Sequence, residues 1–263
     1  MNAPIKTLQT LTKSNKEMAL RAQNELLIDK DFSSLDRYWG DYYIQHNPNL
    51  ANGLPALRVF KEAMVPQATT EILHALADGD KVFFIERVTG LLPVPVGFFD
   101  MYRMEDGKIV EHWDIFTPVE GPNPAGRTVF DGSFEITDLD QTEDNRQLVT
   151  RFAKRCLVLG DFSEIGTYVS ENLIQHSAGM TDGADAFVSY FNYQQWFAQQ
   201  IVYWDVRHVL AEGNFVLTAS QGSVGGVAHA LWDLWRVDDG LIVEHWSIKN
   251  EAKPSPLHTN PMI

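Results

Sequence analysis

The chain contains the same sequence pattern twice. The pentapeptide IVEHW occupies residues 109–113 and recurs at residues 242–246, each time after an Asp-Gly pair. Upstream, DFSSLDRYWGDYYIQH ending at His46 aligns with DFSEIGTYVSENLIQH ending at His176. Similarity over this length means that one structural unit occurs twice, because equivalent apolar positions must be buried in equivalent ways. The predicted organisation is a first domain at residues 1–117, a packed linker at 118–141, and a second domain with a C-terminal tail at 142–263.

The helices of each copy are expected at its beginning. Ser14 and Glu17 form a capping-box pattern that predicts a helix at about residues 15–29, and Thr142 is the expected cap of a counterpart at about residues 143–158. A short second helix should follow the tripeptide DFS in each copy.

The rest of each copy is expected to be mainly sheet. A strand is predicted at residues 43–46 and a helix after Gly53, and the alignment makes this helical stretch four residues longer in the second copy. Asp-Gly and Glu-Gly pairs then mark the turns of two strand pairs. Helices followed by an antiparallel sheet predict an α+β fold in both copies.

The linker between the copies is rich in proline and glycine, which argues against a regular element. It also carries the apolar residues Val129, Phe130, Phe134 and Ile136. We therefore expect a segment that packs against a domain.

Charge and hydropathy exclude several classes of protein. The net charge of −14 repels phosphate backbones and anionic lipid, so nucleic acid is not an expected partner. No apolar run approaches the roughly 18 residues of a membrane span, and MNAPIKTLQTLTKSNKE has no apolar signal core, so we expect a cytoplasmic protein without a membrane partner. The lone Cys156 is interpreted as a buried small side chain rather than a nucleophile.

The turn at Asp106-Gly107 decides which residues of the last two strands share a face. A two-residue loop pairs Glu105 with Lys108 and sets Asp100 opposite Trp113, whereas a three-residue loop pairs Met104 with Lys108 and sets Asp100 opposite His112. We favour the second alternative, because it brings Arg103 beside Glu111. One face then carries Phe98, Asp100, Tyr102, Val110, His112, Asp114 and Phe116, and the second copy repeats it with His229, Leu231, Asp233, Trp235, His245 and Ser247. Ile109, Glu111 and Trp113 are expected on the other face.

A mostly apolar face with a few ionisable groups is typical of a small-molecule pocket. It is also typical of an imperfect core, in which a histidine is hydrogen-bonded and inert. Two carboxylates beside one imidazole are harder to explain in that way, because burial and a close like charge raise a carboxyl pKa and prepare it for acid/base chemistry near neutral pH.

The pattern resembles the SnoaL-like branch of the cone-shaped α+β barrel superfamily that includes nuclear transport factor 2 and ketosteroid isomerase. The residues that carry the resemblance are DGKIVEHWD with Asp100 on the preceding strand, DDGLIVEHWS, and the two IQH strands, each followed by a glycine and a helix. The resemblance implies two tandem barrels, each with a curved sheet around an apolar pocket, and proteins that often dimerise through the sheet. Because these folds host enzymes and binding proteins alike, the function must be argued from the site.

The resemblance also implies roles for residues of the first copy. In the polyketide cyclases of this branch an aspartate on the last strand performs acid/base work without metal or cofactor, and Asp114 matches it. Asp100 stands where those cyclases have a histidine, which puts their substrate in doubt. We predict Asp114, His112, Asp100 and His46 as catalytic residues. Tyr102, Phe98, Phe116 and Tyr43 are the predicted substrate pocket.

The second copy has a different candidate set. Its predicted pocket residues are His176, His229, Asp233, His245 and Ser247, and Ser247 cannot act as a carboxylate base. The spacing of these residues matches no familiar metal motif, and Ser247 lies within a strand rather than on a nucleophile elbow. Gly222, Gly225 and Gly226 do not form a phosphate loop. We expect no metal and no cofactor.

These inferences lead to three functional hypotheses. The first is a cofactor-free enzyme for aldol-type cyclisation, isomerisation or dehydration of a hydrophobic carbonyl compound. The second is a non-catalytic binding protein for an apolar metabolite, and the third is an epoxide-type hydrolase. A hydrophobic small molecule is the expected partner in each case, with a pseudo-dimer inside the chain and a homo-oligomer as a further possibility.

Overall fold

The computed structural model of the chain describes residues 5–194 and 200–263. The chain divides into two compact units: unit 1 comprises Met1–Pro118 and Lys253–Met262, and unit 2 comprises Val119–Ala252 together with Ile263. Within the described part of the chain, no helix is long and apolar enough to cross a membrane.

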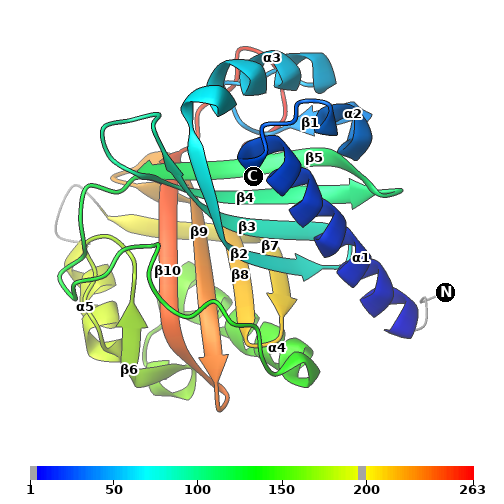
Figure 1. Cartoon of the computed structure of the whole chain (residues 1–263). Helices are drawn as coiled ribbons and strands as arrows, with labels where there is room; N and C mark the ends of the chain where they lie inside the picture. Colours follow the sequence, from blue (N-terminus) through cyan, green and yellow to red (C-terminus); the bar gives the residue numbers. More distant parts are fainter. Residues whose placement is uncertain (1–4, 195–199) are drawn as a thin grey trace. The chain divides into compact units, whose positions relative to one another are not determined.

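Unit 1 places its helices before and against a single sheet (Figure 1). Its helical elements are α1 (Ile5–Gln23), a π-helical continuation (Asn24–Ile28), α2 (Ser34–Tyr38), α3 (Leu54–Met64) and a 3₁₀ turn (Val65–Gln67). Its strands are β1 (Trp39–Gln45), β2 (Thr69–Asp78), β3 (Lys81–Thr89), β4 (Val96–Glu105) and β5 (Lys108–Pro118). The strand order is β1-β5-β4-β3-β2, with β1 parallel to β5 and the remaining pairs antiparallel.

Unit 2 repeats this architecture. Its helical elements are a 3₁₀ turn (Leu139–Gln141), α4 (Thr142–Phe152), a π-helical continuation (Ala153–Val158), a 3₁₀ turn (Ile165–Thr167) and α5 (Ala184–Gln194). Its strands are β6 (Val169–Gln175), β7 (Ile201–Glu212), β8 (Phe215–Val224), β9 (Val227–Asp238) and β10 (Leu241–Glu251), in the order β6-β10-β9-β8-β7. The predicted tandem α+β fold is confirmed.

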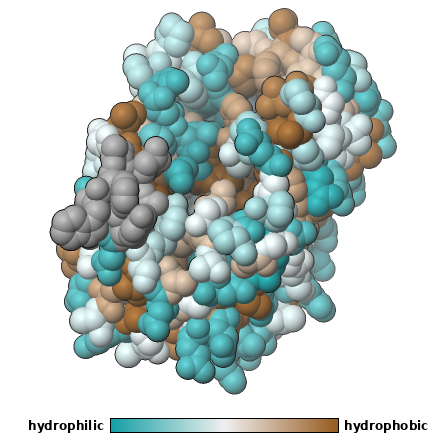
Figure 2. Space-filling model, turned by 90° about the vertical axis from the view of Figure 1, so that its left-hand side faces the viewer, coloured by the Kyte–Doolittle hydropathy of each residue, from teal (hydrophilic) through white to brown (hydrophobic). Residues whose placement is uncertain are grey.

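Each unit buries its own apolar core between the helices and one face of its sheet. In unit 1, Leu26 and Leu35 pack with the sheet residues Phe84 and Tyr102. In unit 2, Phe152 and Phe187 pack edge-on against Trp235. On the molecular face drawn in Figure 2, hydrophilic residues surround small groups of hydrophobic ones. Other buried apolar residues, among them Phe83, Phe99, Trp232 and Leu234, lie outside these two cores.

The helix boundaries differ from the predictions. The first helix already includes Ile5, so Ser14 lies inside it, and Thr142 donates its hydroxyl to Leu139 O instead of capping α4. α5 has 11 residues, as α3 does, so the predicted lengthening is not in the described helix, and residues 195–199 lie outside the described part.

The register of β4 and β5 also differs from the prediction. Asp106 and Gly107 have φ values of 49° and 74°, the geometry of a two-residue turn, and Glu105 pairs with Lys108. The register then shifts before Glu111, which leaves Arg103 opposite Glu111 and Asp100 directly opposite Asp114. The predicted pairing of Asp100 with His112 is wrong, because one bulge adds a residue to β5 after the turn.

The same bulge changes the face of two neighbouring residues. Ile109 pairs with Met104 and belongs to the core together with Tyr102, although it was predicted on the face of Glu111. Val110 lies at the shift, in the neighbourhood of Gly40, and it is not among the residues that line the cavity of unit 1.

The linker that follows the first copy belongs to unit 2, and the tail that follows the second copy belongs to unit 1. The linker after β5 packs within unit 2, where Val129 is buried and Phe134 lies against Trp246. The tail after β10 returns to unit 1, whereas the sequence placed it with the second domain. In the structure the linker thus belongs to unit 2 and the tail to unit 1.

Candidate active site

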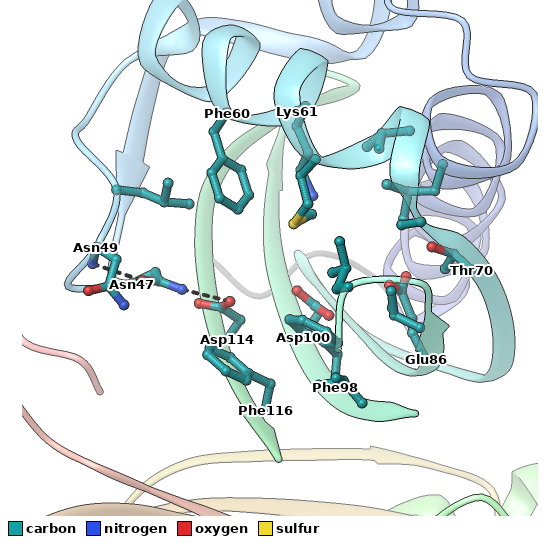
Figure 3. Close-up of a pocket in the computed structure, with 18 of the residues that line it drawn as sticks. Asn47, Asn49, Phe60, Lys61, Thr70, Glu86, Phe98, Asp100, Asp114 and Phe116 are labelled. Atoms are coloured by element: carbon teal, nitrogen blue, oxygen red, sulfur yellow. Dashed lines mark hydrogen bonds between the residues drawn. The ribbon is translucent and has the colours of Figure 1, made fainter. Parts of the chain in front are cut away.

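Unit 1 contains a cavity of about 270 Å³ between α3 and the inner face of the sheet. Most of its wall is apolar, and Figure 3 shows Phe60 and Lys61 of α3 opposite Asp100 and Asp114 of the strands. The remaining residues that line it are Leu27, Asn47, Asn49, Leu50, Leu57, Met64, Val65, Ala68, Thr70, Glu86, Val88, Leu91, Leu92, Val96, Phe98, His112 and Phe116. An apolar wall with a few converging polar groups is the general form of a small-molecule site.

His112 and Asp100 are joined by a hydrogen bond whose proton the two groups share. The Oε1 atom of Gln45 accepts hydrogen bonds from the backbone N–H groups of His46 and Asn47, both at 2.9 Å, so it is an acceptor for the His112 ring as well. Nδ1 of His112, 3.1 Å away, must then carry a hydrogen. Nε2 lies 2.8 Å from Asp100 Oδ1, and one further proton is needed between these two atoms. Asp100 and His112 therefore form a buried pair that shares a proton.

Asp114 presents a partly free carboxyl group to the cavity. Asn47 donates from Nδ2 to Asp114 Oδ2 at 2.9 Å, as Figure 3 shows, and Oδ1 has no hydrogen-bond partner among the described residues. Burial raises the pKa of Asp114, the charge of His112 lowers it, and the charge of Asp100 raises it; the net direction is upward. A carboxyl group in this state can exchange a proton nearer to neutral pH than an exposed aspartate can.

The same three side chains could also bind a small cation. Asp100, His112 and Asp114 are all buried, and their ligand atoms lie within 4.8 Å of one another. A cation would have to displace the proton shared by His112 and Asp100, and Lys61 stands in the same cavity as a competing positive charge.

Two charged cavity residues, Glu86 and Lys61, were missed by the sequence reasoning. Glu86 of β3 is 4% exposed, and its Oε1 atom has no hydrogen-bond partner within residues 5–194 and 200–263. Burial raises the pKa of Glu86 well above its ordinary value, the charge of Asp100 adds to this, and Lys61 opposes it. A glutamate inside the apolar run VFFIERV was the available signal, because a charged residue in a buried strand requires a reason.

The predicted pocket residues fall into two groups. Phe98 and Phe116 line the cavity and stack on each other with ring centroids 5.1 Å apart. Tyr102 and Tyr43 belong to the core behind it, where Tyr102 stacks on His112 at 4.6 Å and donates a long 3.4 Å hydrogen bond to Asp100. Burial raises the pKa of both tyrosines well above the ordinary value, so both hydroxyl groups stay protonated. The two neutral tyrosine rings stack on the ring of His112.

His46 does not lie with the other predicted catalytic residues. Its ring stacks on Trp113 at 4.5 Å, its Nε2 lies 2.9 Å from Glu111 Oε1, and its Nδ1 faces Pro261 O. Glu111 and Trp113 alternate with His112 and Asp114 along β5, so His46 is on the opposite face of the sheet. The prediction that His46 joins the pocket is therefore wrong, because the loop after β1 turns its imidazole outward from the cavity.

Unit 2 has a hydrogen-bonded pair equivalent to His112 and Asp100, but it has no aspartate at the position of Asp114. His245 Nε2 lies 3.0 Å from Asp233 Oδ1, and its Nδ1 lies 3.0 Å from Gln175 Oε1. Where unit 1 has Asp114 and Asn47, Ser247 donates to Ser177 at 2.9 Å. Burial lowers the pKa of His245, which favours the neutral ring.

Aromatic side chains occupy the interior of unit 2 around this pair. Phe187 aligns with Leu57 and packs edge-on against His245, with ring centroids 5.8 Å apart. Phe191 aligns with Lys61 and packs on Tyr203, whose hydroxyl donates to Asp233 at 3.1 Å. Asp233 is therefore satisfied by protein groups, in contrast to Asp114.

The other two histidines predicted for the second pocket are placed elsewhere. His176 repeats His46: it stacks on Trp246 at 4.5 Å, and its Nε2 lies 2.7 Å from Glu244 Oε1. His229 binds Val227 O of its own strand at 2.8 Å. Asp233, His245 and Ser247 thus remain near one another, and His176 and His229 do not join them.

Solved structures that resemble this chain cover less than half of it. Among solved structures, a candidate ketosteroid isomerase from Kribbella flavida DSM 17836 is 14% identical, with 43% of this chain and 84% of that chain covered and a TM-score of 0.37. A candidate SnoaL-like polyketide cyclase from Jannaschia sp. CCS1 is 16% identical over 44% of this chain and 90% of that chain, with a TM-score of 0.36. An LEH-like epoxide hydrolase from M. tuberculosis is 22% identical over 40% and 84% of the two chains, with a TM-score of 0.33. No curated protein matches the chain.

The family assignment rests on the sequence of both copies. The model of the SnoaL-like domain matches residues 20–112 and again residues 149–245, one match in each copy and together more than half of the chain. The chain therefore belongs to the SnoaL-like domain family, as a tandem member with two such domains.

Proposed function

We propose that unit 1 is a cofactor-free enzyme that moves protons next to a carbonyl group of an apolar small molecule. The observation that carries the proposal is the free Oδ1 atom of Asp114, which faces an apolar cavity beside the proton-sharing pair Asp100–His112. A base and an acid on one side of a single cavity are the groups that an enolisation needs.

The proposed step starts with the Asp114 carboxylate, which removes a proton from the carbon next to the substrate carbonyl. The electron pair moves into the carbonyl oxygen, and the proton shared by His112 and Asp100 is donated to that oxygen. Asp114 or the His112–Asp100 pair can then return a proton at the original carbon, at a conjugated carbon or at a leaving group. Isomerisation, dehydration and aldol-type ring closure all share this enolisation.

The cavity supports a compact, mostly hydrophobic substrate. Its volume of about 270 Å³ is close to the lower end of the roughly 300–1,000 Å³ common for small-molecule sites. Glu86 and Lys61 supply polar groups beyond the acid/base trio. We propose that the substrate carries a second oxygen that hydrogen-bonds there.

The enolisation can be tested without knowledge of the natural substrate. Deuterium incorporation from D₂O into 2-tetralone and related bicyclic ketones should be faster with the wild-type protein than in buffer. Replacing Asp114 by Asn should remove the acceleration while the ketone still binds, as measured by calorimetry. Binding without acceleration by the wild type would favour the alternative of a non-catalytic binding protein.

A further inference from the structure

The C-terminal tail holds the loop that follows β1 in unit 1. Asn260 donates from Nδ2 to Gln45 O and to Asn52 Oδ1, both at 2.9 Å. His258 Nε2 lies 3.0 Å from Asn47 O, and Ser255 donates to Pro48 O at 2.8 Å. The carbonyl of Pro261 faces the ring of His46. The tail therefore contacts the backbone carbonyls of Gln45, Asn47 and Pro48.

The last residue of β1, Gln45, and the loop residue Asn47 carry the two side chains that hold the acid/base groups. Gln45 accepts the Nδ1 hydrogen of His112, and Asn47 donates to Asp114. The backbone carbonyls of these same two residues are the acceptors for Asn260 and His258. A displacement of the loop would move Gln45 and Asn47 together and would change the environment of His112 and Asp114.

We propose that the C-terminal tail, through Asn260 and His258, positions Gln45 and Asn47 and thereby completes the acid/base site of unit 1. The inference rests on the proposed function for its catalytic consequence. Its geometric part concerns only the placement of the loop and stands independently of the reaction.

Unit 2 uses the same arrangement with the other connecting segment. Asn123 of the linker donates from Nδ2 to Gln175 O at 2.9 Å and to Ser177 O at 3.3 Å. The carbonyl of Thr128 faces His176 Nδ1 at 3.2 Å, as that of Pro261 faces His46. Both segments contain an Asn-Pro pair, at residues 123–124 and 260–261.

The same contact occurs in both units, which is not expected of a chain end that packs non-specifically. In each unit the loop after the first strand is held by the segment that follows the last strand of the other copy. The site of unit 1 therefore depends on Asn260 and His258, which follow β10 in the sequence. This dependence is a physical reason for two copies to be joined in one polypeptide.

The test compares Asn260→Ala combined with His258→Ala against the matched variant Asn123→Ala, all in the full-length chain. The titratable groups around Asp114 are Asp100 on β4, His112 on β5, Lys61 on α3 and Tyr43 on β1, and none of them is altered. The first readout is the ¹³C NMR titration of the Asp114 carboxyl. The hydrogen bond from Asn47 lowers its pKa, so loss of the tail contacts should move the titration to higher pH. Asn123→Ala should leave it unchanged.

The second readout is deuterium exchange into 2-tetralone. We expect the tail variant to lose between roughly tenfold and a hundredfold in kcat with a smaller change in KM, because misplacement of catalytic groups acts mainly on the chemical step. Asn123→Ala should keep kcat. An unchanged Asp114 titration in a folded tail variant, or an equal shift in Asn123→Ala, would overturn the inference. If the wild type shows no exchange, the proposed function fails, and the titration still decides the positioning role. Ser255→Ala serves as a milder tail variant if the double variant does not fold.

Discussion

Asp100 and Asp114 lie directly opposite each other on β4 and β5, and both side chains are buried in one apolar cavity. Opposite residues of an antiparallel pair have Cβ atoms only about 4.5–5.5 Å apart, so two negative charges here repel strongly. The structure relieves this repulsion with the proton shared between Asp100 and His112 and with the amide of Asn47. The arrangement leaves Asp114 as the carboxyl group that can accept a substrate proton.

Replacing Asp114 by Asn should abolish catalysis and stabilise the protein at neutral pH. We expect a loss of at least about a hundredfold in the rate of deuterium exchange, because the amide cannot accept the proton. The folded-state pKa of Asp114 is raised, so the wild type loses stability as pH rises from the unfolded value of about 4 through the folded value. The variant avoids this loss and should have a higher Tm than the wild type at pH 7.5.

The control for this variant is Ser247→Ala, at the equivalent position of unit 2. It should leave the exchange rate unchanged, since the Ser247 hydroxyl donates to Ser177 within unit 2. The gain in Tm of Asp114→Asn should shrink toward pH 4.5. A gain of equal size at both pH values would show that the carboxyl group is not the cause.

The exchange rate of the wild type should fall on the acid side with an apparent pKa above the ordinary aspartate value of about 4. Protonation of Asp114 removes the base, and the burial of this side chain moves its protonation to higher pH. A profile of kcat/KM between pH 4 and 8 measures this limb. A rate that stays flat down to pH 4 would argue against Asp114 as the base.

Glu86 should determine affinity for ligands with a second oxygen. Glu86→Leu is expected to weaken binding of 6-methoxy-2-tetralone by about fivefold and to leave 2-tetralone nearly unaffected, since a lost hydrogen bond contributes roughly 1 kcal/mol. Glu86→Gln keeps the shape and hydrogen-bonding capacity and serves as the conservative control. Calorimetric titration with both ketones measures the difference, and equal losses for the two would contradict the assignment.

Leu57→Phe should fill the cavity of unit 1, because phenylalanine is the residue at the equivalent position 187 of unit 2. Leu57 lines the cavity, whereas the aligned Phe187 is completely buried against His245. The larger ring should weaken ketone binding at least about tenfold and leave Tm unchanged or higher, because it fills open space. The reverse change, Phe187→Leu, should lower stability by roughly 1–2 kcal/mol without an effect on exchange. A Leu57→Phe protein with normal ketone binding would show that the ligand lies elsewhere.

Treatment with a chelator should leave the exchange rate unchanged. Both ring nitrogens of His112 are already hydrogen-bonded, to Gln45 and Asp100, and Lys61 adds a positive charge to the cavity. Dialysis against EDTA followed by addition of Zn²⁺, Mn²⁺ or Mg²⁺ tests this expectation. Loss of activity that one of these ions restores would assign Asp100, His112 and Asp114 to a metal site instead.

Much of the architecture was predictable because it depends on local patterns. The repeated IVEHW and IQH strings, with their Asp-Gly turns, identified two α+β copies with the same order of elements. Alternation along β4 and β5 placed Phe98, Asp100, His112, Asp114 and Phe116 on one face, and all of them line the cavity. Periodicity and turn chemistry act over a few residues, so the sequence alone carries this information.

The sequence by itself thus determined the tandem fold and the face that bears the candidate acid/base groups. Only the tertiary structure decided that Asp100 faces Asp114, that His46 turns to Glu111, and that Glu86 enters the cavity. A single bulge shifts the register by one residue, and its cost is set by packing on both faces rather than by the turn. The placement of the tail was likewise decided by contacts between residues more than 200 positions apart, such as Asn260 and Gln45, and that of the linker by contacts such as that of Asn123 with Gln175. A sequence pattern within one copy cannot predict such a contact, because only the folded chain brings these residues together.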